Sequence, residues 1–94
     1  MGKIEDTIGK PAVLEQLAEE AAELAQAALK YARILRNENP TPVSEMEAVN
    51  NLIEEYTDVL HCAIELNLSM DGTQLVYKDK RWNDRIIKNN MEGC

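Results

Sequence analysis

The sequence predicts an all-α protein, because three long segments have the periodicity of amphipathic helices and helix-breaking residues separate them. β-Branched residues are too scattered for any segment to be assigned as a strand. With 94 residues, the chain has room for one domain, spanning 1–94. A chain of this length buries only about 60–65% of its unfolded surface, so we expect oligomerisation to supply part of the core.

The first helix is expected from about Pro11, a residue suited to the first turn, to about Leu35. The segment RNENPTPV (36–43) then ends it, because two prolines so close together cannot continue a helix.

The second helix is expected to begin at a capping box, in which Ser44 accepts a hydrogen bond from the backbone N–H of Glu47, and to continue to about residue 67. The segment NLSMDG (67–72) separates it from a third helix over about 73–89. Asp71 and Ser69 are both candidates for the N-cap of this third helix.

The charge of the chain restricts its partners. Seventeen acids against ten bases give a net charge of −7, which argues against binding a nucleic acid polymer. A nucleotide held through divalent cations remains compatible with this charge. No apolar run approaches the roughly 20 residues of a membrane span, and the first ten residues lack a signal-peptide core. Cys62 and Cys94 form neither a metal-ligand spacing nor a disulfide framework. We therefore expect a cytoplasmic protein.

Two of the helices carry the same unusual pattern of acids. LAEEAAELAQAA (17–28) aligns with LIEEYTDVLHCA (52–63), and each has a pair of acids three residues apart on the same flank of its apolar stripe. The helical periodicity predicts that this stripe contains Leu17, Leu24, Ala28, Tyr31 and Leu35 in the first helix and Leu52, Val59, Ala63 and Leu66 in the second. These acids are Glu20 and Glu23 in the first helix, and Glu55 and Asp58 in the second. Each of them taken alone is most simply a solvated residue paired with lysine or arginine. That interpretation does not explain why the pattern occurs twice.

Four partly buried carboxylates that face one another would repel strongly and would favour a divalent cation. Hard oxygen ligands suit Mg²⁺ or Mn²⁺. A di-iron site is disfavoured, because His61 is the only histidine and lies opposite the apolar stripe, where we expect a solvated side chain.

The third helix combines an apolar stripe with a basic flank. Leu75, Trp82 and Ile86 form the stripe, and Trp82 is expected in the core. The flank consists of Lys78, Arg81 and Arg85. A basic flank is usually solvated or paired with neighbouring acids, but beside a carboxylate–metal cluster it would meet phosphate oxygens.

These motifs resemble the MazG-like, all-α nucleotide pyrophosphohydrolases. The matching elements are EEAAE (19–23), EEYTD (54–58) and YKDKRWNDR (77–85), and the resemblance covers about residues 12–87. It implies a helical bundle of the all-α nucleoside triphosphate pyrophosphatase type, completed in a homodimer or homotetramer.

The resemblance also implies roles for individual residues. Mg²⁺, or Mn²⁺ in its place, would be held by four catalytic acids: Glu20, Glu23, Glu55 and Asp58. Glu19 and Glu54 would orient a water or the ligands, and the phosphates would be contacted by Lys78, Arg81 and Arg85. Either Glu20 or Glu23 could accept the proton of the attacking water.

Such enzymes cleave a nucleoside triphosphate between its α and β phosphates, giving a monophosphate and pyrophosphate. Two alternatives stay open. The same fold hydrolyses phosphoribosyl-ATP in histidine biosynthesis, and the chain could instead be a non-catalytic helical module that binds a partner.

Overall fold

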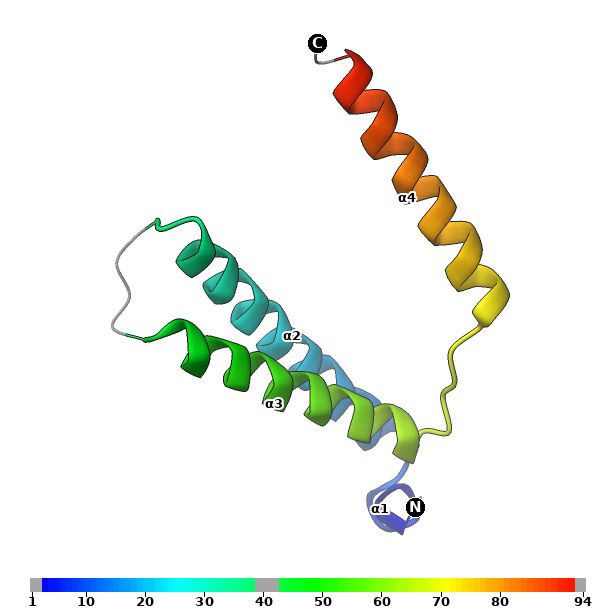
Figure 1. Ribbon diagram of the computed structural model, residues 1–94. Coiled ribbons are helices and arrows are strands. Elements are labelled where there is room, and N and C mark those ends of the chain that lie inside the picture. Colours follow the sequence, from blue (N-terminus) through cyan, green and yellow to red (C-terminus); the bar gives the residue numbers. More distant parts are fainter. Residues whose placement is uncertain (1–2, 39–42, 93–94) are drawn as a thin grey trace.

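Four α-helices and no strand make up the part of the chain that the computed structural model describes, residues 3–38 and 43–92 (Figure 1). The helices are α1 (Lys3–Ile8), α2 (Lys10–Leu35), α3 (Glu45–Glu65) and α4 (Gly72–Glu92). The all-α prediction is confirmed, and the three predicted helices correspond to α2, α3 and α4. The two prolines predicted to end the first helix lie at 40 and 42, outside the described residues. None of the described helices has the length and apolarity that a membrane crossing requires.

α1 is a short helix that the sequence periodicity did not predict. It ends at Gly9, whose φ of 90° lies in the left-handed region that glycine adopts without steric cost. The N–H of Gly9 donates to the carbonyl of Glu5 at 2.8 Å, and Pro11 lies in the first turn of α2, as predicted. The chain therefore changes direction at Gly9, and α1 packs against α2 and α3.

The predicted capping residues begin α3 and α4. Ser44 Oγ accepts a hydrogen bond from the N–H of Glu47 at 3.1 Å, and Asp71 Oδ1 accepts one from the N–H of Gln74 at 3.1 Å. The N-cap of α4 is thus Asp71 rather than Ser69. α3 ends with Asn67 in the left-handed conformation, at φ 57°. The segment between α3 and α4 is therefore short and capped at both ends.

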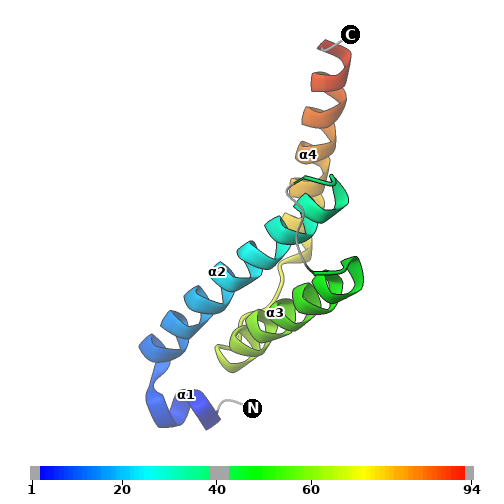
Figure 2. The same ribbon diagram turned by 90° about the vertical axis from the view of Figure 1, so that its left-hand side faces the viewer.

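α2 and α3 lie side by side and antiparallel, and together they form the α2–α3 hairpin (Figures 1 and 2). The buried apolar residues lie along the seam between the two helices and are mostly small: Val13, Ala27, Ala48, Cys62 and Leu66. Glu65 is also buried. The predicted stripe of α2 is only partly right, since Leu17 and Leu24 are half-buried whereas Leu35 is exposed. The face of α2 that packs against α3 is therefore rotated away from the predicted stripe and towards the flank that carries Glu20 and Glu23.

α4 packs against none of the other described helices and projects away from the hairpin (Figures 1 and 2). Its predicted stripe is therefore exposed, and the prediction that Trp82 lies in the core is wrong for the single chain, where this side chain is 63% exposed. The radius of gyration is 17.5 Å, compared with about 12 Å for a compact domain of this length. The chain alone leaves one of its amphipathic helices without a partner.

Candidate metal centre

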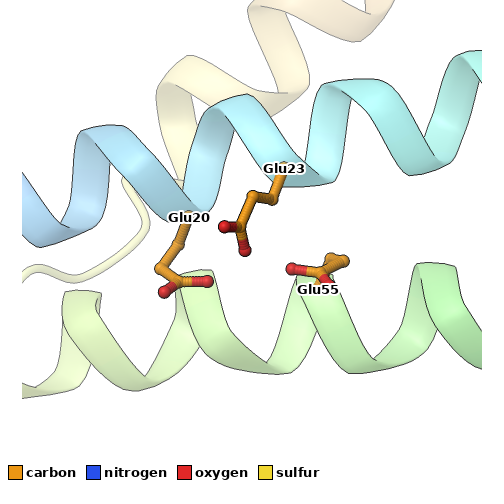
Figure 3. A group of neighbouring side chains, drawn as sticks. All are labelled: Glu20, Glu23 and Glu55. Carbon is orange, nitrogen blue, oxygen red and sulfur yellow. The ribbon is translucent and has the colours of Figure 1, made fainter.

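Three of the four predicted metal ligands converge between α2 and α3. Glu20 and Glu23 extend from α2 and Glu55 from α3, and one carboxylate oxygen of each lies within 4.8 Å of the other two. Figure 3 shows the three side chains directed into the space between the two helices. We call this group the acid cluster.

The local sequence explains how carboxylates come to lie at a helix–helix seam. Residues three apart lie on the same face of a helix, so Glu20 and Glu23 project together towards α3. The nearby seam residues Ala27 and Cys62 are small and buried, so no bulky apolar side chain fills the space in front of Glu55. The acids occupy that space instead.

The acid cluster contains buried oxygen atoms that lack partners. Oε2 of Glu20 and Oε2 of Glu55 are both inaccessible to solvent and accept no hydrogen bond. The other oxygen of Glu20 accepts a hydrogen bond from Gln16 Nε2 at 2.7 Å. Leaving buried carboxylate oxygens unpaired is costly, and a divalent cation would satisfy both of them. The donor set, three carboxylates with oxygen ligands only, fits a hard cation such as Mg²⁺ or Mn²⁺.

The electrostatics of the cluster favour a cation for a second reason. The pKa of Glu23 is raised, first by its contact with Glu55, because two carboxyl groups share a hydrogen bond only when one is protonated. The negative charge of Glu55 and partial desolvation raise the pKa of Glu23 further, Glu20 lowers it, and the charge of Asp58 adds a smaller increase. Without a cation, the charged form of Glu23 is therefore less favourable than that of an isolated carboxylate.

The fourth predicted ligand, Asp58, lies outside the acid cluster. It is half-buried on α3, one turn beyond Glu55, and its side chain is one methylene shorter. The negative charge of Asp58 nevertheless affects groups at the seam, because it raises the pKa of Glu23 and of Cys62. Burial is the main cause of the raised pKa of Cys62, with Glu20 next. His61 is exposed, as predicted, and lies 3.7 Å from Glu65 rather than in the cluster.

A pocket of about 400 Å³ extends from the acid cluster along the hairpin. Its lining residues are Glu23, Gln26, Ala27, Lys30, Asn51 and Glu55. Lys30 is a pocket residue that the sequence reasoning missed, although it follows Glu23 by seven residues and therefore lies on the same face of the helix. Asn51 likewise precedes Glu55 by four residues. The pocket has carboxylates at one end and an ammonium group two helical turns away.

The other predicted site residues are exposed. Glu19 and Glu54 lie on the solvent side of α2 and α3, and their suggested role in orienting ligands stays a prediction. The three basic residues of the predicted phosphate site, Lys78, Arg81 and Arg85, are exposed on α4. Because α4 contacts neither α2 nor α3, a single chain does not bring this basic flank to the acid cluster.

Comparison with known proteins adds no assignment. No family model, no curated protein and no solved structure matches this chain. The acid cluster and its pocket are therefore the features of this chain that bear on its function.

Proposed function

We propose that this protein is a Mg²⁺-dependent nucleoside triphosphate pyrophosphohydrolase of the MazG-like, all-α type. It would cleave the α–β phosphoanhydride of an NTP or dNTP and release a monophosphate and pyrophosphate. The observation that carries the proposal is the convergence of Glu20, Glu23 and Glu55, with two buried carboxylate oxygens that lack partners. The repeated acidic motifs of α2 and α3 support it.

The acids of the cluster would hold the cation, with Asp58 as a fourth ligand and Mn²⁺ as a substitute metal. A bound divalent cation would neutralise phosphate charge and lower the pKa of a coordinated water. Glu23 is favoured over Glu20 as the proton acceptor. Gln16 holds one oxygen of Glu20 and the other is buried, whereas Glu23 is exposed and lines the pocket.

The pocket suits an elongated anion whose reacting end lies at the acids. Lys30 would contact a phosphate oxygen at the far end, where its ammonium group offers three donors. Gln26 and Asn51 would add neutral hydrogen-bonding groups between the two ends. The volume of about 400 Å³ lies in the range of small-molecule sites, about 300–1,000 Å³.

The proposal is tested by offering the purified protein a panel of nucleoside and deoxynucleoside triphosphates, with phosphoribosyl-ATP as a further substrate. We expect Mg²⁺-dependent release of pyrophosphate, abolished by EDTA. Glu23→Gln should lower kcat at least about 100-fold, whereas Glu15→Gln, which removes the same charge from an exposed position on α2, should leave it unchanged. Orthophosphate as the first product, or equal activity in both variants, would contradict the proposal.

The non-catalytic alternative has one observation in its favour: residues 72–90 of α4 are all exposed, and α4 contacts no other described helix. A helix that packs against nothing is typical of a segment that binds a partner. Absence of turnover, together with thermal stability that does not respond to Mg²⁺, would favour this alternative.

A further inference from the structure

The two oxygens of the Glu20 carboxylate lie in different environments. Oε1 accepts a hydrogen bond from the side-chain amide of Gln16, with Nε2 at 2.7 Å, a short distance that is typical of a charged acceptor. Oε2 is buried and accepts no hydrogen bond. Gln16 thus engages one oxygen of this carboxylate and leaves the other for a cation.

The positions of the neighbours along α2 keep these two environments apart. Gln16 precedes Glu20 by four residues and Glu23 follows it by three, which places them about 6 Å before and about 4.5 Å after Glu20 along the helix axis. They therefore approach the Glu20 carboxylate from opposite directions. Figure 3 shows one oxygen of Glu20 turned towards Glu23 and Glu55 and the other turned away from them.

The number of oxygens that a carboxylate offers affects which cation it prefers. Mg²⁺ demands near-ideal octahedral geometry and keeps several of its waters, so single oxygens from separate carboxylates suit it, and Mn²⁺ accepts a similar ligand set. Ca²⁺ is larger, takes about six to eight oxygens in a flexible geometry and readily accepts both oxygens of one carboxylate. One oxygen each from Glu20, Glu23 and Glu55 is therefore a donor set of the Mg²⁺ type.

We propose that Gln16 is a positioning residue that makes the acid cluster select Mg²⁺ or Mn²⁺ over Ca²⁺. Its amide holds Oε1 of Glu20, so that Glu20 binds the ion through Oε2 alone. Binding of Ca²⁺ through both oxygens breaks this hydrogen bond, whereas binding of Mg²⁺ through one oxygen preserves it. The inference rests on the proposed function for the presence of the ion, and it adds a residue that contacts neither the ion nor the substrate.

The selectivity distinguishes this role from a merely structural one. Gln16 is exposed, and a side-chain pair four residues apart also adds a little stability to an isolated helix. Loss of such a pair would lower the stability of the metal-free chain and would affect the binding of both ions alike. The ratio of the Mg²⁺ and Ca²⁺ affinities changes only if Gln16 controls how Glu20 meets the ion.

The test is calorimetric titration of the metal-free full chain with MgCl₂ and, separately, with CaCl₂. Gln16→Met removes the donor while keeping an unbranched side chain with a good helix propensity. Gln16→Lys restores a donor within reach of Glu20, and its charge weakens the binding of both ions alike. The matched control is Ala18→Met, which introduces the same side chain at another exposed position of α2.

We expect Gln16→Met to lower the Mg²⁺ affinity about tenfold, as is typical when a group that orients a metal ligand is lost. The Ca²⁺ affinity should stay unchanged or rise, because Glu20 can then offer both oxygens. Gln16→Lys and Ala18→Met should keep the wild-type ratio of the two affinities. Circular dichroism should show the same helix content in all four proteins.

The inference is overturned if Gln16→Met keeps the wild-type ratio, if Ala18→Met changes the ratio equally, or if Gln16→Lys fails to restore it. Nucleotide hydrolysis with Mg²⁺, together with an unchanged ratio in Gln16→Met, would refute this inference alone. The expected change in ratio without any nucleotide hydrolysis would refute the proposed function alone. A wild type that binds neither ion would overturn both.

Discussion

Replacing Glu55 by glutamine should stabilise the metal-free protein, which is unusual for a half-buried position. Oxygen atoms of Glu20 and Glu55 lie within 4.8 Å of each other, and two unit charges at this distance repel by about 1 kcal/mol in water and by about 3 kcal/mol at an effective dielectric constant of ~20. Both side chains are partly solvated, so we expect a gain of about 1–2 kcal/mol. The new amide can also donate a hydrogen bond to the buried oxygen of Glu20.

The measurement is thermal unfolding by circular dichroism, at one protein concentration, in EDTA and again in Mg²⁺. In EDTA, Glu55→Gln should raise Tm by roughly 5–10 °C, whereas Glu15→Gln, with the same net charge, should change Tm little. In Mg²⁺ the wild type gains stability by binding the ion, and the variant gains less, because it has lost a ligand. The reasoning is refuted if Glu55→Gln melts no higher than Glu15→Gln in EDTA, or if Mg²⁺ stabilises the variant and the wild type equally.

Two further predictions concern the pocket. The folded-state pKa of Glu23 is raised above its ordinary value of 4.5, so the folded protein favours the protonated carboxyl. The stability that the Glu23 carboxyl contributes is therefore fully present below pH 4.5, and it is lost as the pH rises through the folded-state pKa and the carboxyl becomes charged. The Tm difference between the metal-free wild type and Glu23→Gln should therefore shrink as the pH falls from neutral towards 4.5; a constant difference would contradict this. Lys30→Ala should raise KM about tenfold or more with Mg²⁺ binding intact, and an unchanged KM would remove Lys30 from the substrate site.

The three long helices and the acid pairs were predictable because both depend on local sequence. Capping by Ser44 and Asp71 uses donors three residues away, and the spacing of Glu20 and Glu23 places them on one face whatever the helix packs against. The repetition of that spacing in α3 predicted which acids would meet, and three of the four meet.

The remaining features depend on how the helices pack, which periodicity alone does not determine. The sequence predicted a seam along Leu17 and Leu24, but the small residues Ala27 and Ala48 allow the helices to pack on the neighbouring face. That rotation brings Glu55 against α2 and leaves Asp58 beyond it. The exposure of Trp82 has a different origin, because an amphipathic pattern indicates that a face will be buried and does not indicate by which chain.

The cations of α4 could not replace a metal ion in the acid cluster, even if a second copy of the chain brought them there. Residues 72–94 contain three acids and five bases, and their net charge of +2 is small beside the −9 of residues 1–71, which contain 14 acids and five bases. Each ammonium or guanidinium group also carries a single charge on a long side chain, whereas the oxygens of Glu20, Glu23 and Glu55 lie close enough to share one ion. The two buried oxygens lie at the seam, where a small divalent cation fits better than a guanidinium group. Cations on long side chains would therefore leave in place the demand of these oxygens for a divalent metal ion.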